Sequence, residues 1–226
     1  MQPFFVTASG TNVGKTHVMS TLCWQLREAG KQVTALKPVI SGYDPEDTYN
    51  DAAMILRSCG LEPTDALTKS ISKWRYKAPL APNMAANSDQ TKQLDMQELV
   101  AYCKEHETVS SDVLMVEGVG GILVPLNDEY TVADWMHELD WPAILVVGSY
   151  LGTISHTLSA IEVLQKRNIP VRALVVNQSP NIDIPLEDTV ATFEKFVDED
   201  IPIVKMPRVE KHEPWKHMPL ITWMVE

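Results

Sequence analysis

The segment FFVTASGTNVGKTHV, residues 4–18, constrains the fold of this chain more than any other. It opens with an apolar run, continues as a loop of small residues, and reaches Gly14-Lys15-Thr16 before a stretch typical of a helix. A strand, a small loop, Gly-Lys-Thr and a helix in this order are typical of a P-loop, whose backbone N–H groups and helix dipole receive phosphate oxygens. The segment therefore predicts a phosphate site in which Lys15 reaches the outer phosphates and the Thr16 hydroxyl holds Mg²⁺.

The P-loop match departs from the usual pattern at one position. The usual motif has a glycine five residues before Gly14, whereas this chain has Ser9 there and Gly10 one residue later. The alternative interpretation is a glycine-containing turn between a strand and a helix, with an incidental lysine. We favour the P-loop because Gly-Lys-Thr directly after a strand is uncommon by accident.

Length, composition and charge limit the class of protein. A chain of 226 residues with 45% hydrophobic residues suffices for one sizeable α/β domain or two small ones, and we expect one domain over residues 1–226. No apolar run approaches the roughly 18 residues of a membrane span, and the first residues lack the basic region of a signal peptide. The net charge of −11 argues against general nucleic-acid binding. From the charge and the lack of a long apolar run we expect no nucleic-acid or membrane partner. Three cysteines without CxxC spacing indicate reduced thiols, so we expect a cytoplasmic protein.

Apolar runs typical of strands alternate with helix-like segments along the chain. The expected strands are 4–6, 33–39, 113–116, 143–147, 173–176 and 201–204. The expected helices are 16–29, 51–58, 96–106, 132–139, 154–166 and 188–197. Nearly continuous apolar strands flanked by helices indicate an α/β P-loop NTPase fold with a doubly wound, mostly parallel sheet and helices on both faces. The stretch 64–93 has a weak pattern and several prolines, so we expect it to be irregular, either as a wall of a cleft or as a surface loop.

Ligands of such sheets bind at the carboxyl ends of the strands, which makes the residue types there informative. Lys37 sits inside an otherwise apolar run. Its stem could pack while its ammonium escapes to solvent, or the ammonium could point into the phosphate cleft. Ser41, followed by a glycine, would add a hydroxyl close by.

Two acidic residues are candidates for the Mg²⁺ shell. Asp51 begins an expected helix, where it or Asn50 could simply be an N-cap, so the sequence leaves its role open. Glu117 ends an apolar strand and would meet the Mg²⁺ shell opposite Thr16, whereas the alternative is an exposed acid at a strand-to-turn junction. The glycines at 118, 120 and 121 would let the backbone approach a phosphate or a substrate closely.

The ends of the fourth and fifth expected strands carry further polar groups. Residues 148–156, GSYLGTISH, form a small-residue turn before a helix and are suited to bind a carboxylate. His156 is better explained as a helix-surface residue than as a catalytic base. Asn177 and Gln178 end the fifth strand, where an amide could pair with an adenine edge or serve only in a turn. The loop at Pro207 follows the last strand and would lie beside the base.

With these strand ends in view, the chain resembles the dethiobiotin synthetase family. The matching segments are FFVTASGTNVGKT, ALKPVISG, YND, YKAPLAPNMAA, LMVEGVGGILVPL with TVADW, ILVVGSYLGTISHT and VVNQ. The resemblance implies a homodimer with the substrate site at its interface, Mg²⁺, and ATP as co-substrate. It implies that CO₂ is joined to 7,8-diaminononanoate and the ring closed to dethiobiotin, through a carbamate and a carbamic–phosphoric anhydride, in biotin biosynthesis.

The resemblance also implies roles for individual residues. The catalytic residues would be Lys37, Lys15 and Thr11. The nucleotide-binding residues would be Asn12, Val13, Gly14, Lys15, Thr16, His17, Asp51, Glu117, Gly118, Val119, Gly120, Asn177, Gln178 and Pro207. The metal ligands would be Thr16, Asp51 and Glu117. The substrate-binding residues would be Thr11, Lys37, Ser41, Gly152, Thr153 and Ser155, of which the last three would act across the dimer.

Three departures from the family pattern keep other functions open. The family usually has Gly where Ala8 stands, an acid where Asn12 stands and Asn where Ser155 stands, so a relative that binds nucleotide without turnover is one alternative. A second alternative is a P-loop ATPase switch of the partitioning or positioning type. Such switches carry a further lysine early in the loop, where this chain has Gly10.

Overall fold

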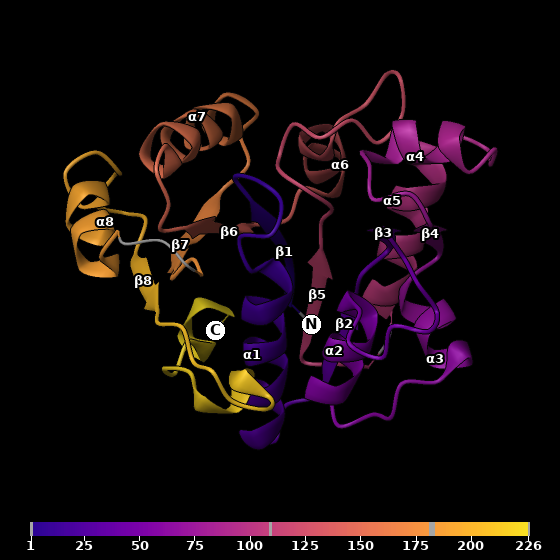
Figure 1. The fold of residues 1–226 in the computed structure, drawn as a ribbon, viewed down its shortest axis with the longest axis horizontal. Helices are drawn as coiled ribbons and strands as arrows, with labels where there is room; N and C mark the ends of the chain where they lie inside the picture. Colours follow the sequence, from indigo (N-terminus) through magenta and orange to yellow (C-terminus); the bar gives the residue numbers. More distant parts are fainter. Residues whose placement is uncertain (1, 109, 181–183, 226) are drawn as a thin grey trace.

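A six-stranded parallel sheet forms the centre of the molecule, with strand order β2-β5-β1-β6-β7-β8 (Figure 1). The computed structural model describes residues 2–108, 110–180 and 184–225. The strands of this sheet are β1 (Gln2–Ala8), β2 (Val33–Leu36), β5 (Val113–Glu117), β6 (Ala143–Gly148), β7 (Val171–Asn177) and β8 (Ile203–Met206). Every pair of neighbours runs parallel. The expected α/β fold with a mostly parallel sheet is therefore confirmed.

Helices cover both faces of this sheet because successive side chains of its strands enter two different apolar layers. In β1, Phe4 and Val6 belong to one layer and Phe5 to the other, and β6 divides Ile144 and Leu145 in the same way. The first layer is covered by α1 (Lys15–Glu28) and by the short 3₁₀ turn η3 (Thr222–Val225), and the turn η2 (Pro214–His217) lies against α1. The second layer is covered by α5 (Met96–Glu105), α6 (Val132–Leu139), α7 (Thr153–Lys166) and α8 (Leu186–Phe193).

The strand order creates a crevice at the end of β1. This strand pairs with β5 on one side and with β6 on the other, so the chain winds away from it in both directions. Ligands of open α/β sheets bind at such a switch point, outside the carboxyl ends of the strands. The loop after β1 and Glu117, the last residue of β5, both lie at this position.

The expected single strand over 33–39 is wrong, because the run is divided into β2 and β3 (Val39–Ser41). The break falls at Lys37 and Pro38. The Lys37 N–H donates to Ile71 O at 3.0 Å instead of to a neighbouring strand, and proline has no N–H to continue a ladder. Strand β3 then pairs with β4 (Trp74–Tyr76) in a separate two-stranded parallel sheet.

The expectation that 64–93 is irregular is also wrong. This stretch contains α3 (Asp65–Ile71), β4 and α4 (Pro82–Ser88). These elements are too short for a clear period, but their starts carry local signals. Thr64 accepts a hydrogen bond from Leu67 N as the N-cap of α3, and proline begins α4.

The other helix predictions differ from the structure mainly at the ends. Helix α2 (Asp51–Ser58) and helix α6 agree with prediction at both ends, and α5 stops one residue early because the 3₁₀ turn η1 (His106–Thr108) follows it. Helix α8 begins after Pro185, two residues before the expected start, and ends four residues early. No helix within residues 2–108, 110–180 and 184–225 is both long and apolar enough to cross a bilayer.

Candidate active site

The loop between β1 and α1 has the backbone that a phosphate-binding loop needs. Asn12 and Gly14 have positive φ angles of 59° and 100°, and Gly14 is the N-cap of α1. A Cβ atom at position 14 would lie 1.9 Å from Nδ2 of Asn177, so only glycine fits there. Asn177 Nδ2 donates to Val13 O at 3.0 Å, which ties the end of β7 to this loop.

Lys15 begins α1, and its ammonium is held by main-chain oxygens. Nζ donates to Gly120 O at 2.8 Å and to Gly10 O at 3.3 Å, and the residue is only 7% exposed. Burial, together with the charge of Lys37, lowers the pKa of Lys15 to about 8, against the attraction of the two nearby carboxylates. The ammonium therefore lies at the floor of the crevice, where it can exchange these carbonyls for anionic oxygens.

Thr16, Asp51 and Glu117 come together from three different elements, namely α1, α2 and β5. Thr16 Oγ1 lies 2.9 Å from Asp51 Oδ1 and 2.9 Å from Glu117 Oε1. The N-cap of α2 is Asn50, which accepts a hydrogen bond from Ala53 N, so Asp51 is not needed as the cap. The geometry therefore favours the interpretation in which the Asp51 carboxylate faces Thr16 as a candidate metal ligand.

Lys37 completes this cluster from the break between β2 and β3. Its Nζ lies 2.5 Å from Glu117 Oε1 and 3.3 Å from Asp51 Oδ2, and it donates to Gly118 O at 2.8 Å. The side chain is 3% exposed, so the interpretation in which the ammonium escapes to solvent is wrong. Burial alone would lower the pKa of Lys37, but the charges of Glu117 and Asp51 outweigh it and raise the pKa.

The oxygen atoms of this cluster fit a magnesium ion. Glu117 Oε2 and Ser41 Oγ are buried and have no hydrogen-bond partner, so oxygen atoms are left over for a ligand. Mg²⁺ is bound in proteins by one or two carboxylates together with substrate phosphates and water. In the described part of the chain, no three His, Cys, Asp or Glu side chains are grouped so that they alone could hold a metal ion. A hydroxyl and two carboxylates match this donor set.

These residues line one hollow of about 810 Å³, which we call the P-loop hollow. Its predicted lining residues are Thr11, Asn12, Gly14, Lys15, Thr16, His17, Lys37, Ser41, Asp51, Glu117, Val119 and Gly120. Its further lining residues, which the sequence analysis did not single out, are Met54, Pro79, Leu80, Ala81, Pro82 and Val124. Residues 79–82 belong to the segment YKAPLAPNMAA, so of the two uses expected for 64–93 the wall of a cleft is the one observed. Gly118, which was also predicted to bind nucleotide, is not among the residues that line this hollow. Its carbonyl oxygen accepts a hydrogen bond from Lys37 Nζ.

A smaller hollow of about 270 Å³, the β7 hollow, lies on the other side of the P-loop. Its predicted lining residues are Asn12, Val13, Gly14, His17, Asn177 and Gln178. Its lining also includes Ser179, Pro180, Arg208, Val209 and Pro214, which are not among the predicted site residues, whereas Pro207 does not contribute to it. Arg208 N donates to Gln178 Oε1 at 3.0 Å, so this amide is already engaged with the loop after β8.

Three predicted substrate residues lie outside both hollows. Gly152, Thr153 and Ser155 form the start of α7. Thr153 uses its hydroxyl inside the turn, donating to Gly148 O at 2.6 Å, and its N–H donates to Tyr150 O. Within one chain these residues therefore do not reach the P-loop cluster.

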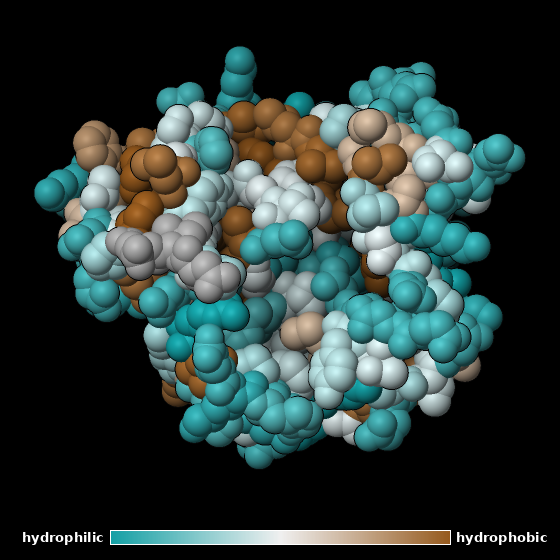
Figure 2. All heavy atoms as spheres, in the orientation of Figure 1, coloured by the Kyte–Doolittle hydropathy of each residue, from teal (hydrophilic) through white to brown (hydrophobic). Residues whose placement is uncertain are grey.

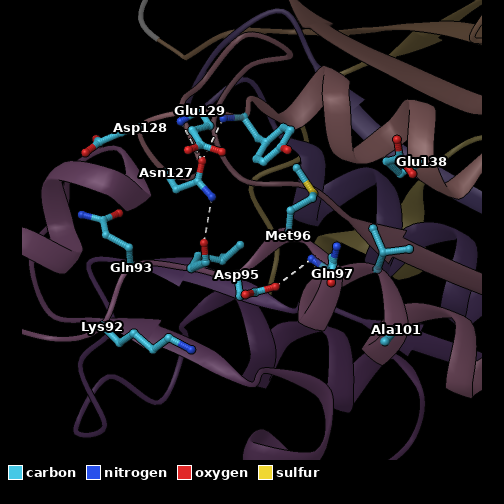
Figure 3. A pocket seen from close by; sticks show the side chains of 13 residues that line it. Lys92, Gln93, Asp95, Met96, Gln97, Ala101, Asn127, Asp128, Glu129 and Glu138 are labelled. Atoms are coloured by element: carbon cyan, nitrogen blue, oxygen red, sulfur yellow. Dashed lines mark hydrogen bonds between the residues drawn. The ribbon is translucent and has the colours of Figure 1, made fainter.

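A further hollow of about 830 Å³, the α5 hollow, lies away from the P-loop (Figure 3). Its lining residues are Lys92, Gln93, Leu94, Asp95, Met96, Gln97, Val100, Ala101, Asn127, Asp128, Glu129, Tyr130 and Glu138. Asp95 serves here as the N-cap of α5, and Asn127 Oδ1 accepts from the N–H groups of Glu129 and Tyr130. None of the predicted site residues lies in this hollow.

Comparison with known proteins agrees with this geometry. A family model described as an AAA domain matches residues 2–213. The ATP-dependent dethiobiotin synthetase of Acidiphilium cryptum is 41% identical over 191 residues, which cover 84% of this chain and 85% of that protein. The corresponding synthetase of Caulobacter vibrioides is 41% identical over 212 residues, covering 92% of this chain and 93% of that protein.

Solved structures share the fold at low sequence identity. The cell division ATPase MinD of Pyrococcus furiosus has a TM-score of 0.55 at 18% identity, covering 92% of this chain and 84% of that one. The septum site-determining protein MinD of Pyrococcus horikoshii has a TM-score of 0.54 at 16% identity, covering 91% and 81%. This likeness concerns the fold alone, whereas the two synthetases match at 41% over most of both chains. The chain therefore belongs to the ATP-dependent dethiobiotin synthetases, a family of ligases.

Proposed function

We propose that this chain joins CO₂ to 7,8-diaminononanoate and closes the ring to dethiobiotin, using ATP with Mg²⁺ and releasing ADP and phosphate. One observation carries the proposal: two lysines, a threonine and two acids meet in the P-loop hollow, in a chain that belongs to this family. These residues are Lys15, Lys37, Thr16, Asp51 and Glu117. One domain over residues 1–226 would perform the whole reaction.

The nucleotide would lie across the two hollows that share the P-loop. Its phosphates would occupy the P-loop hollow beside Lys15, and its base would occupy the β7 hollow beside Asn177 and Gln178. Thr16, Asp51 and Glu117 would hold Mg²⁺, which when bound neutralises phosphate charge and orients the outer phosphates. The MinD of Pyrococcus horikoshii, which shares the fold, is described as a complex with Mg-ADP.

The proposed reaction has three steps. An amine of the substrate adds to CO₂, losing a proton, and forms a carbamate. A carbamate oxygen then attacks the γ-phosphorus of ATP, which gives a carbamic–phosphoric anhydride and ADP. Finally the neighbouring amine attacks the activated carbon, the C–O bond to phosphate breaks, and a cyclic urea and inorganic phosphate remain.

The chain's own side chains contribute by placing charge and by orienting the reactants. A carbamate and a triphosphate are both anionic and repel each other unless cations separate them. Lys37 is held at the centre of the cluster by Glu117 and Asp51, and Lys15 lies at its floor. The Lys37 ammonium is held in place before substrate arrives, so it can stabilise charge on the transferring phosphoryl group with little rearrangement, whereas Lys15 would exchange its two carbonyl partners for phosphate oxygens. Thr11 and Ser41 would position the substrate at the mouth of the hollow.

The substrate carboxylate would be bound by the partner subunit of a homodimer. Gly152, Thr153 and Ser155 begin α7 outside the P-loop hollow, and the adjacent Leu151 is 89% exposed. Figure 2 shows apolar side chains gathered on the molecular face above the sheet, in the region of α6 and α7. An exposed apolar surface next to a helix N-terminus is suited to a subunit contact that presents backbone N–H groups to an anion.

The proposal is tested with purified protein, ATP, Mg²⁺, bicarbonate and diaminononanoate, followed by mass detection of the cyclic urea. We expect the purified protein to form this product only when ATP, Mg²⁺, bicarbonate and diaminononanoate are all present. Nucleotide binding without product would instead indicate a relative that lost turnover. ATP hydrolysis that is stimulated by DNA or lipid, and not by the diamine, would indicate a nucleotide-dependent switch.

A further inference from the structure

Residues 207–225 follow β8 and run back along α1, and we call this segment the strap (Figure 1). Three residues of the strap, Arg208, Val209 and Pro214, line the β7 hollow. His17 of α1 lines the same hollow. The strap is therefore one wall of the hollow in which we place the nucleotide base, and α1 contributes another.

Gln25 of α1 holds the strap through both ends of its side-chain amide. Its Nε2 donates to Pro219 O at 2.7 Å and to Met218 O at 3.4 Å, and its Oε1 accepts from Ile221 N at 2.9 Å. The residue is only 6% exposed. Because a buried amide costs free energy unless it is hydrogen-bonded, this side chain and the strap backbone satisfy each other.

The strap is fixed a second time where it leaves β8, since Arg208 N donates to Gln178 Oε1 at 3.0 Å. Residues 209–217 lie between these two anchors, and Pro214 of this part lines the β7 hollow. The next residue, Trp215, is 2% exposed, and its turn η2 lies against α1. A wall that is held at both ends keeps its distance from α1, because neither end is free to swing away.

The later part of the strap has an anchor of its own. Arg172 Nε of β7 donates to Met224 O at 3.1 Å. Met224 and Val225 are buried in the apolar layer that α1 covers. Loss of the Gln25 hydrogen bonds should therefore loosen the wall of the β7 hollow without detaching the whole strap from the molecule.

We propose that Gln25 is a positioning residue for the nucleotide, because it holds the strap at the distance from α1 that shapes the β7 hollow. This inference rests on the proposed function, in which the base occupies that hollow. Gln25 lines neither the P-loop hollow nor the β7 hollow, so it acts through the strap. It lies about 15 Å along the axis of α1 from Lys15. One helix thus places a phosphate-binding ammonium at its start and fixes the wall of the base site further along.

The two halves of the nucleotide should respond differently when this anchor is lost. A loosened strap takes up its binding position for only a fraction of the time, and the apparent affinity falls by that fraction, so we expect about a tenfold loss for Mg-ADP. Inorganic tripolyphosphate has phosphates but no base, so its affinity should not change. The KM for ATP should rise with little change in kcat, because none of residues 207–225, all of which the structure describes, lines the P-loop hollow.

Gln25→Met tests this inference, because methionine keeps the length of the side chain and removes its hydrogen bonds to the strap. Calorimetry with Mg-ADP and, separately, with Mg-tripolyphosphate measures the two affinities. Gln165→Met is the matched control, since Gln165 of α7 donates to Asp198 Oδ2 at 2.8 Å on the surface, and it should leave both affinities unchanged. An unchanged affinity of Gln25→Met for Mg-ADP, or equal losses for Mg-ADP and Mg-tripolyphosphate, would overturn the positioning role.

A second measurement uses the wild-type protein, so it does not depend on the folding of a variant. Hydrogen exchange followed by mass spectrometry reports the protection of the strap backbone with and without ligand. We expect Mg-ADP to slow exchange over residues 208–221 and Mg-tripolyphosphate to leave it unchanged. In Gln25→Met the same residues should exchange faster, whereas β1 should not. Exchange in the strap that does not respond to Mg-ADP would overturn the inference.

These outcomes separate the inference from the proposed function. A wild-type protein that binds no Mg-ADP would overturn both. Binding of Mg-ADP together with equal losses for both ligands in Gln25→Met would overturn the positioning role alone. A selective loss for Mg-ADP would support the positioning role even if no cyclic urea were formed, and the proposed reaction would then be the part that is wrong.

Discussion

The P-loop hollow and the α5 hollow have nearly the same volume, about 810 and 830 Å³, but their polar groups serve different purposes. In the α5 hollow, Asp95 Oδ1 accepts from the N–H groups of Gln97 and Glu98, and Asn127 Nδ2 donates to Leu94 O (Figure 3). Asp95 caps the start of α5, and Asn127 holds both its own turn and the segment before α5, so these groups are used to hold the backbone. Lys92 at the rim is solvated, with a side chain that is 79% exposed.

In the P-loop hollow the charges of Lys37 and Glu117 are buried, that of Asp51 is partly exposed, and all three come from distant parts of the chain. Lys37 and Glu117 have side chains that are 3% and 0% exposed, and Glu117 Oε2 has no partner. Burying charge is costly unless the charges are paired, so a cluster of this kind indicates function rather than stability. The comparison teaches that the volume of a hollow does not single out a candidate active site, whereas buried charge with an unused oxygen does.

The largest effect should come from Lys37→Ala, which removes one of two cations from the P-loop hollow. We expect turnover to fall on the order of 10²–10³-fold, because a preorganised charge at the transferring group is lost. Steady-state assays measure this, with circular dichroism to show that the variant is folded. Lys92→Ala, which removes a cation from the α5 hollow, is the control and should leave turnover unchanged. Normal turnover of Lys37→Ala would refute the role of this lysine.

Asp51→Asn should raise the Mg²⁺ concentration required for half-maximal activity by about 10–100-fold. The substitution keeps the size of the side chain but removes a charge that faces Thr16 and Lys37. A magnesium titration of activity measures the change. Asp65→Asn is the matched control, because Asp65 also begins a helix but pairs only with exposed Lys69. The same magnesium requirement in both variants would exclude Asp51 as a ligand.

Gly14→Ala should impair nucleotide binding and lower the free energy of unfolding by about 1–2 kcal/mol, because a side chain at positive φ is strained. The new Cβ atom would also displace Nδ2 of Asn177 from Val13 O. Calorimetry with Mg-ADP and urea unfolding measure the two effects. Gly30→Ala tests the strain alone, since residue 30 has a φ of 78° but open space around its Cβ. If Gly14→Ala and Gly30→Ala lose the same affinity for Mg-ADP, the contact between position 14 and Asn177 has no part in nucleotide binding.

A smaller effect should come from Asp134, which lies in neither hollow. Burial alone would raise its pKa, but hydrogen bonds from Thr131 and Arg167 outweigh it and lower the pKa below 3.8. The ionised form is therefore the stabilising one. Its contribution is fully present above pH 3.8 and is lost as the pH falls through the lowered pKa.

Asp134→Ala should accordingly cost about 1 kcal/mol in the free energy of unfolding at neutral pH, through loss of the capping box of α6. Urea unfolding at neutral pH and near pH 3 measures the difference between wild type and variant, which should shrink in acid. A difference that stays constant with pH would show that the charge of Asp134 contributes nothing. Turnover should not change.

The smallest effect should come from removing two negative charges from the α5 hollow with Asp128→Asn and Glu129→Gln together. Both side chains are on an exposed turn, so we expect the free energy of unfolding to change by no more than about 0.5 kcal/mol. Turnover should equal that of the wild type in the same assay. A clear loss of turnover would contradict the assignment of the reaction to the P-loop hollow alone and would give the α5 hollow a part in it.

The features that the sequence determined by itself depend on neighbours along the chain. The P-loop was predictable because Gly14, Lys15 and Thr16 closely follow a strand. The starts of α2 and α6 agree because Asn50 and Thr131 are local N-caps. Glu117 was predictable because an acid at the end of an apolar strand must lie at the ligand-binding edge of a parallel sheet. Periodicity and turn chemistry are short-range properties, so one sequence suffices to read them.

The remaining features were decided by the tertiary structure, because they depend on contacts between residues far apart in the chain. Whether the Lys37 ammonium turns inward depends on the position of Glu117 and Asp51, and the second sheet exists only because β3 meets β4. Residues 79–82 wall the P-loop hollow without any local pattern that predicts it.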